Sequence, residues 1–316
     1  MSDIEKYLQS KGLSKATVKY YNAEILKFIT WCDMQNVETE QISSTDVTAY
    51  LKYLNDKGQE SLTKSIQLII LKHYFSYQIS KGERESNPAK NIKIRGAKTH
   101  TLYPIFSKAE LESIYHSYEV PKANDSRNKR NWFTSSRLSR QRNKAVLSLM
   151  IYQGLCTDEI NRLSLSDVRL KEGTIYIVGS RSSEERTMEL RSHQIMELME
   201  YQLSTREELL KLTQRESELY FITSLPRSKS SAGNMQLSID TVYIWKGLSK
   251  EIKQQHPKFS NFRQVRTSVI THWLKQYNLR QVQYMAGHRY ISSTEHYLVN
   301  QTEDLQNDID KFHPLG

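Results

Sequence analysis

The first 95 or so residues carry the periodicity of α-helices alone, whereas the rest of the chain mixes helical and strand patterns. Apolar residues recur at helical spacing in three early segments, at 15–32, 44–54 and 61–80. The stretch 82–101 contains Asn87-Pro88 and has no sustained periodicity, which is typical of an exposed linker. Because 316 residues exceed the usual size of one domain, the sequence predicts two.

We expect an all-α N-terminal domain over 1–95, a linker at 96–104 and a second domain over 105–316. In the first domain, Ser14 is placed to cap the first long helix, and Ser44 or Thr45 to open the second. The apolar residues of the third helix predict its buried face, which is Ile66, Ile69, Ile70 and Tyr74.

The second domain is predicted to be α+β and mainly helical, with a small antiparallel sheet. Ser107 and Glu110 have the spacing of a capping box that opens a helix to Tyr118. Two short strands at 173–178 and 186–190 flank a polar turn and predict a hairpin. Further helices are expected at 142–153, 192–212, 238–252, 262–276, 278–286 and near 293–300.

The net charge of +10 and the pI near 9.3 favour an anionic polymer as partner, although solvated lysines alone can give such values. The segment 121–144 holds eight Lys or Arg residues and a single acid. It is either a disordered basic loop or a phosphate-contacting insertion. Trp132 and Phe133 within it favour the insertion. The residues we expect to contact DNA are Lys129, Arg130, Arg137 and Arg140.

The chain carries few signs of metal, disulfide or membrane chemistry. Its two cysteines, Cys32 and Cys156, are far apart in sequence, which indicates neither a disulfide framework nor a Cys-rich metal site. We find no Walker loop, no convincing carboxylate cluster for two metals and no apolar run long enough for a membrane span. We therefore expect a cytoplasmic protein without a metal, a cofactor or a membrane partner.

A Gly-His pair lies close before a tyrosine near the C-terminus. Gly287 is placed to end one helix, and Ser292 with Glu295 has the spacing of a capping box that opens the next. On one unbroken helix, His288 and Tyr297, nine residues apart, would lie on opposite faces. A break between them lets both point into one cleft. Alone, this pattern is weak, since a tyrosine on a helix is more often a core residue.

Two arginines precede this region. Arg263 and Arg266 are three residues apart, so we expect them to share a helix face opposite the apolar side chains. Adjacent like charges destabilise a helix unless an anion lies between them. A solvated helix face is the alternative.

Taken together, these motifs resemble the tyrosine recombinase (phage integrase) family, which includes Xer- and Cre-type enzymes. Residues 1–95 are similar to the family's SAM-like core-binding domain. Residues 153–163, with Glu159, resemble the family's first catalytic box, and the turn of the hairpin resembles the one that carries a catalytic lysine. The resemblance implies that Tyr297 is a nucleophile and that Arg266 and His288 bind the phosphate.

The chain departs from the family pattern at three positions. Cys156 stands where the first box has arginine, Arg181 aligns with the hairpin lysine, and Arg263 replaces a histidine or lysine. A thiol cannot replace a bidentate guanidinium, so another arginine is expected to compensate. We expect Arg181 to do so. Arg186 and Arg263 are weaker candidates, because Arg186 is expected to point along its strand.

The resemblance implies a site-specific recombinase or integrase that cleaves and rejoins double-stranded DNA through a covalent 3′-phosphotyrosine. The phosphodiester energy stays in the covalent bond, so no ATP, metal or cofactor is required. The family also implies a homotetramer on DNA that exchanges C-terminal tails, and a role in a mobile element. In the tail, Leu305, Ile309 and Phe312 form an apolar stripe. The alternatives are a catalytically inactive DNA-binding protein and a type IB topoisomerase.

Overall fold

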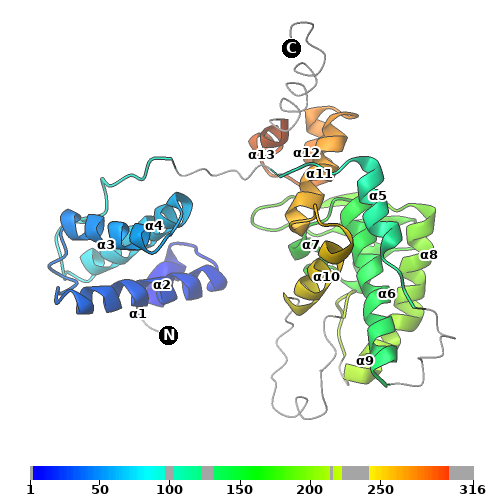
Figure 1. Cartoon of the computed structure of the whole chain (residues 1–316), viewed down its shortest axis with the longest axis horizontal. Helices are drawn as coiled ribbons and strands as arrows, with labels where there is room; N and C mark the ends of the chain where they lie inside the picture. Colours follow the sequence, from blue (N-terminus) through cyan, green and yellow to red (C-terminus); the bar gives the residue numbers. More distant parts are fainter. Residues whose placement is uncertain (1–2, 97–102, 122–130, 214–215, 223–241, 299–316) are drawn as a thin grey trace, which may run out of the picture. The chain divides into compact units, whose positions relative to one another are not determined.

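The computed structural model describes residues 3–96, 103–121, 131–213, 216–222 and 242–298 (Figure 1). The chain divides into two compact units, Met1–Thr101 and Leu102–Gly316, which are called the N-terminal and C-terminal units below. Within the described ranges, no helix is both long enough and apolar enough to cross a membrane.

The N-terminal unit is a bundle of helices around an aromatic core. Its helices are α1 (Asp3–Ser10), α2 (Lys15–Met34), α3 (Ser44–Asp56) and α4 (Ser61–Ser80). Phe28 of α2 is fully buried, and its ring contacts the edges of Tyr50 and Phe75 with centroids 4.9 and 5.9 Å apart. Large rings supply much apolar area per residue, so three long helices suffice to enclose a core in this small unit.

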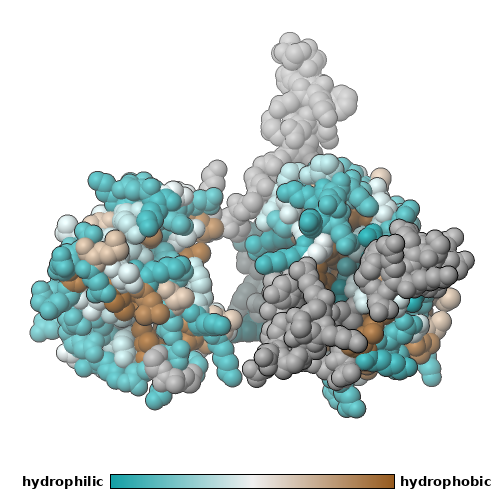
Figure 2. Space-filling view, turned by 60° about the horizontal axis from the view of Figure 1, so that its bottom comes forward, coloured by the Kyte–Doolittle hydropathy of each residue, from teal (hydrophilic) through white to brown (hydrophobic). Residues whose placement is uncertain are grey.

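The predicted helices of this unit form, with two differences. The Ser14 hydroxyl caps α2 by accepting the Thr17 amide, as expected. Helix α3 begins at Ser44, as expected, and Ser43 caps it, because Ser43 and Asp46 bond each other's backbone reciprocally. Ile69 is 46% exposed and does not join the core, and α1 was not predicted. Figure 2 shows hydrophobic residues reaching the surface of this unit among hydrophilic ones.

The C-terminal unit is mainly helical. Its first helix, α5 (Lys108–Ser117), begins with the predicted capping box of Ser107 and Glu110. The long helix α6 (Asn131–Tyr152) runs through the unit and packs against α5 and α11 (Figure 1). The other helices are α7 (Thr157–Arg162), α8 (Ser192–Glu200), α9 (Arg206–Thr213), α10 (Val242–Gln255), α11 (Phe262–Leu274), α12 (Leu279–Ala286) and α13 (Ile291–Glu295).

A three-stranded antiparallel sheet accompanies the helices, in the order β1 (Val168–Arg169), β2 (Thr174–Ile177), β3 (Arg186–Glu189). The predicted hairpin is confirmed as β2 and β3, whereas β1 was not predicted. The register pairs Ile175 with Met188 and Ile177 with Arg186. Since Ile177 points into the core, Arg186 lies on the inward face of the sheet.

The basic segment is not a loop over the part that the structure describes. Residues 131–144 form the N-terminal part of α6, which starts eleven residues earlier than the predicted helix at 142. Phe133 and Leu138 are buried there, and so is the guanidinium of Arg142, which donates to the Ile222 carbonyl. A helix rich in Arg and Lys forms here because its few apolar side chains pack on the core while the long cations bond to neighbours.

Candidate active site

A sharp turn at Gly287 separates α12 from the C-terminal helices. Gly287 adopts φ +66°, in the left-handed region that ends helices, and the next amide, of His288, donates to the Gln283 carbonyl. The predicted capping box of Ser292 and Glu295 is wrong. Helix α13 begins at Ile291 instead, and the residue before it has no side-chain cap.

This turn brings His288 and Tyr297 together. Tyr297 lies in a short 3₁₀ turn after α13, half-buried against an apolar cluster of α11 and α12. Its ring stacks on the imidazole of His288, with centroids 5.6 Å apart and planes at 16°. The His288 Nδ1 bonds the hydroxyl of buried Thr294 at 2.9 Å. The imidazole is therefore held from both the ring face and one nitrogen.

The imidazole of His288 lies in a positively charged, largely buried position. Burial lowers the pKa of His288, and the nearby charges of Arg266 and Arg186 lower it further, to about 4. His288 is therefore neutral near pH 7 in the free protein. A neutral imidazole can donate one hydrogen bond or take up a proton, depending on its tautomer.

Arg266 links three parts of the C-terminal unit. Its Nη1 donates to the Glu159 carboxylate at 2.9 Å and to the Gly154 carbonyl at 2.6 Å, and its Nη2 donates to the Ala286 carbonyl at 2.6 Å. Its side chain is 13% exposed. Arg263 is exposed on α11, whereas Arg266 turns inward to Glu159. The alternative of a solvated helix face therefore holds for Arg263 and not for Arg266, and the prediction that both lie opposite the apolar side chains is wrong for Arg266.

Glu159 is the shared partner of the buried cations. Its carboxylate accepts from Arg266, from Arg186 at 2.7 Å and from the amide of Cys156 at 2.8 Å. Burial alone would raise the pKa of Glu159, but the bond from Arg186 and the charge of Arg266 lower it to about 2. Glu159 is therefore an anion throughout the neutral range.

The prediction that Arg186 points along its strand is wrong. Its side chain is completely buried and forms an ion pair with Glu159. The signal was the hairpin register, which places Arg186 opposite inward-pointing Ile177.

The hairpin turn contacts the Gly-His segment. The Glu184 amide donates to the Gly287 carbonyl at 2.9 Å, and Arg289 pairs with the Glu184 carboxylate at 2.8 Å. Arg181 is an exposed residue of this turn. The backbone of the turn that carries Arg181, the predicted compensating arginine, therefore contacts the backbone of the residue before His288.

Two of the four residues predicted to contact DNA lie on α6 and have partners within the unit. Arg137 lies 3.6 Å from Glu208. Arg140 donates to the Glu119 carbonyl at 2.8 Å, lies 3.7 Å from Glu251 and covers the ring of Tyr118. Lys129 and Arg130 lie outside the described residues.

These groups define a class of site. A tyrosine ring stacks on a neutral imidazole, and a guanidinium is anchored on the backbone just before that histidine. Among the described residues, no cluster of His, Cys, Asp and Glu has the arrangement of a metal site. Such a donor set suits an enzyme that transfers a phosphoryl group to tyrosine.

Sequence models identify that enzyme class. The model of the phage integrase family matches residues 119–304, and that of the phage integrase N-terminal SAM-like domain matches residues 4–82. The chain therefore belongs to the phage integrase family. It is a tyrosine recombinase, an enzyme that cleaves and rejoins DNA.

Relatives cover almost the entire chain. The tyrosine recombinase XerD of Staphylococcus saprophyticus is 26% identical, over 98% of both chains. XerD of Oceanobacillus iheyensis is 27% identical, over 96% of this chain and 94% of its own.

Solved structures share the fold at lower identity. The XerH recombinase in its post-cleavage complex with difH has a TM-score of 0.67 at 19% identity, covering 96% of this chain and 81% of its own. The Tn1549 transposon integrase with transposon right end DNA has a TM-score of 0.62 at 14% identity, covering 98% of both chains.

Proposed function

We propose that Tyr297 is the nucleophile of the recombinase reaction and that Arg266 and His288 stabilise the phosphate it attacks. The observation that carries this proposal is the stacking of Tyr297 on His288 directly after the Gly287 turn. Arg263, exposed one helical turn before Arg266, and Arg181, in the adjacent hairpin turn, complete the proposed set.

The proposed reaction conserves the phosphodiester energy. The Tyr297 hydroxyl loses its proton as its oxygen bonds to phosphorus, while the bond from phosphorus to the 5′ oxygen breaks and that oxygen takes up a proton. The products are a 3′-phosphotyrosine and a free 5′ hydroxyl, and the reverse reaction joins a new strand. Negative charge grows on the non-bridging oxygens, so fixed donors such as Arg266 lower the barrier.

The test is the covalent protein–DNA adduct. Tyr297→Phe removes the hydroxyl and keeps the ring that stacks on His288, so DNA binding should survive and the adduct should vanish. Tyr290→Phe is the matched control, because Tyr290 is 68% exposed seven residues earlier and should leave the adduct yield unchanged. An adduct of normal yield from Tyr297→Phe would refute the assignment, and a wild type that binds DNA without forming an adduct would indicate an inactive binder.

We further propose that 1–95 is a core-binding domain, which closes on double-stranded DNA together with the catalytic domain 105–316 through the 96–104 linker. Lys129, Arg130, Arg137 and Arg140 are the proposed backbone contacts. Neutralising Lys129, Arg130 and Arg137 together should weaken binding to all sequences and flatten its salt dependence. An unchanged slope would refute a phosphate role for this segment.

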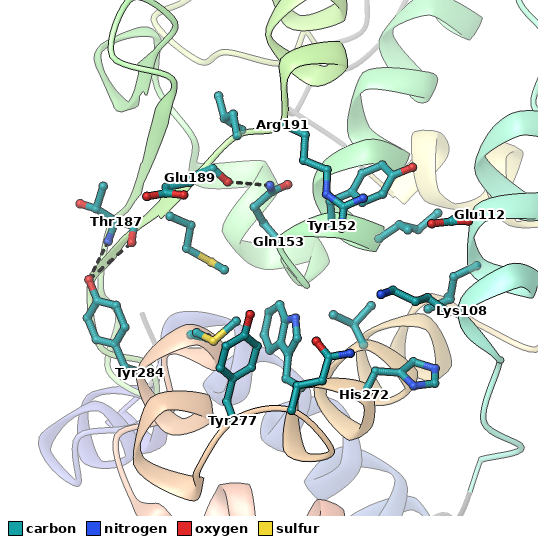
Figure 3. Close-up of a pocket in the computed structure, with 18 residues that line it drawn as sticks. Lys108, Glu112, Tyr152, Gln153, Thr187, Glu189, Arg191, His272, Tyr277 and Tyr284 are labelled. Carbon is teal, nitrogen blue, oxygen red and sulfur yellow. Dashed lines mark hydrogen bonds between the residues drawn. The ribbon is translucent and has the colours of Figure 1, made fainter.

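The active assembly is proposed to be a homotetramer on DNA that exchanges C-terminal tails. The tail residues Leu305, Ile309 and Phe312 lie outside the described residues. The proposed acceptor is a pocket of about 440 Å³ lined in part by β3 and α12, where Tyr284 bonds the backbone of Thr187 (Figure 3). Its lining combines apolar side chains, such as Trp273 and Met285, with charged ones, such as Lys108 and Glu112.

Truncation after Val299 tests this assembly. It should spare binding to a single DNA site and abolish synapsis of two duplexes. Aggregation of the truncated chain would indicate instead that the tail packs on its own protomer. We further propose that the enzyme acts in the cytoplasm at the nucleoid and serves a mobile element.

A further inference from the structure

Arg186 is a buried cation that the proposed reaction does not account for. Its side chain is fully inaccessible to solvent, and it makes one ion pair, from Nη1 to the Glu159 carboxylate at 2.7 Å. Within the described part of the chain, its Nε and Nη2 are buried without a hydrogen-bond partner. Burial of a guanidinium with two unpaired donors is strongly unfavourable, so an arginine at this position calls for a compensating role.

The backbone of the Gly-His turn is built around this guanidinium. A Cβ at position 287 would collide with Arg186 Nη1 and would lie 3.1 Å from the Glu184 carbonyl. Gly287 is therefore required by the left-handed turn and also by the close approach of Arg186. Arg186 lies between Glu159 and the segment that carries His288.

Glu159 connects the two arginines, because its carboxylate accepts a hydrogen bond from each. Its Oε1 is held by Arg186, while its Oε2 is held by Arg266 and by the Cys156 amide. Without Arg186, one carboxylate oxygen would lose its partner, and the carboxylate could rotate about its remaining bonds. Arg266 would then lose the fixed acceptor that aligns its Nη1.

The charges in this cluster do not balance. Two guanidiniums share one carboxylate, which leaves one excess positive charge beside His288, and burial strengthens its field. Position 156, from which the family's first-box arginine would supply a cation, holds a half-buried thiol. The excess charge is therefore delivered from β3 instead of from the start of α7.

We propose that Arg186 is a positioning residue for DNA cleavage, which fixes Arg266 through Glu159 and supplies the positive charge that Cys156 cannot. The proposal rests on the proposed reaction at Tyr297. Loss of a purely structural ion pair would lower only the stability of the protein. Loss of Arg186 as a positioning residue should also slow the chemical step in protein that is still folded and still binds DNA.

The test is single-turnover cleavage of a nicked DNA substrate at saturating protein, with Arg186→Met. Methionine fills the space and leaves Glu159 and Arg266 as a neutral pair, so the unit can fold. The cleavage rate should fall roughly a hundredfold, as expected when a catalytic group is displaced slightly. The dissociation constant for DNA should change by less than about threefold, because Arg186 is inaccessible to DNA in the free protein.

Arg206→Met is the matched control. Arg206 is a buried arginine of the same unit, 4% exposed, but it bonds to backbone carbonyls after α9 and not to the site. It should lower the melting temperature and leave the cleavage rate of the folded protein unchanged. An Arg186→Met variant that is folded and cleaves at the wild-type rate would overturn the proposal.

A double-mutant cycle tests the route through Glu159. If Arg186 acts by holding Glu159, then Glu159→Gln with Arg186→Met should cleave no slower than the slower single variant. Multiplied rate losses would show that Arg186 acts independently of Glu159. If Arg186→Met fails to fold, Arg186→Lys is the second variant, because its ammonium keeps the charge but has fewer hydrogen-bond donors. A cleavage rate clearly below that of wild type supports the positioning role, and a wild-type rate overturns it.

Failure of this proposal differs visibly from failure of the proposed function. If wild-type protein forms no adduct at Tyr297, the reaction itself is misassigned. If wild type forms the adduct and Arg186→Met forms it equally fast, only the role of Arg186 is refuted.

Discussion

Glu24 in the N-terminal unit and Glu159 in the C-terminal unit are both buried carboxylates, but their partners differ. Glu24 bonds to Lys27 of its own helix at 2.7 Å and to the amide of Gln67, and the Lys27 side chain is 67% exposed. Glu159 is held between two guanidiniums, one of them fully buried. The cation of Glu24 is well exposed to water, whereas the two cations of Glu159 are completely or largely buried.

This difference separates a structural charge from a reactive one. A single lysine that reaches solvent balances Glu24, so nothing in that cluster requires a further anion. The Glu159 cluster keeps an excess cation in a poorly solvated place, next to a histidine and a tyrosine. The excess buried charge lowers the stability of the C-terminal unit, but it is an arrangement that suits the binding of a phosphate. The Glu24 cluster of the N-terminal unit has no such excess charge.

The largest effect expected from this contrast is on stability. Glu159→Gln leaves one fully buried and one largely buried guanidinium without their anion, and it should lower the free energy of unfolding of the C-terminal unit by about 3–5 kcal/mol. Glu24→Gln should cost no more than about 1 kcal/mol, since its cation is exposed. Hydrogen exchange followed by mass spectrometry separates the two units, and equal losses would contradict the contrast.

The hairpin arginine gives the next largest effect. If Arg181 contacts the phosphate from the turn beside Gly287, Arg181→Ala should reduce single-turnover cleavage by roughly a hundredfold with little change in DNA binding. Arg169→Ala on β1 is the control, because Arg169 is also an exposed arginine of the sheet and should cleave normally. A harmless Arg181→Ala would leave Arg186 as the source of the compensating charge.

A smaller effect is expected on the pH dependence of stability. The pKa of His288 is lowered to about 4 in the folded protein, so the unfolded chain binds more protons between pH 6.5 and 4. The C-terminal unit should therefore lose stability as pH falls through this window, by at most about 1.4 kcal/mol per pH unit from this group. His288→Gln should remove that part of the slope in urea titrations, and an unchanged slope would show that His288 is not buried as a neutral group.

The smallest effect is expected at Cys156. Its thiol replaces an arginine without taking over its charge, and burial raises its pKa, so it stays neutral. Cys156→Ala should change the cleavage rate by less than about twofold. A loss of tenfold or more would show that the thiol itself takes part in the reaction.

The fold was predictable wherever local signals decide the structure. Ser14 and Ser107 cap the helices that follow them, and the hairpin of β2 and β3 follows from alternation around a polar turn. The start of α6 was not predictable in this way, because residues 131–144 are stabilised by packing of Phe133 and Leu138 and not by an apolar stripe. Tertiary contacts override weak periodicity there.

The site was predictable in its residues but not in its electrostatics. The spacing of Gly287, His288 and Tyr297 indicates a break that lets two side chains meet, and the structure brings them together. The inward turn of Arg266 and the burial of Arg186 depend on Glu159, which is 107 and 27 residues away from them in sequence. Periodicity in the sequence does not indicate pairing over such distances. The pairing of Arg186 with Ile177 in the hairpin does indicate that Arg186 faces inward.

The most direct test of the account is to map the covalent adduct by mass spectrometry. Wild-type protein is trapped on a nicked DNA substrate, digested with nuclease and protease, and searched for a peptide that carries a nucleotide remnant. The account predicts a phosphotyrosine linkage at Tyr297, in the peptide that follows His288. A linkage at Tyr290, at Tyr284 or at any other side chain would contradict it.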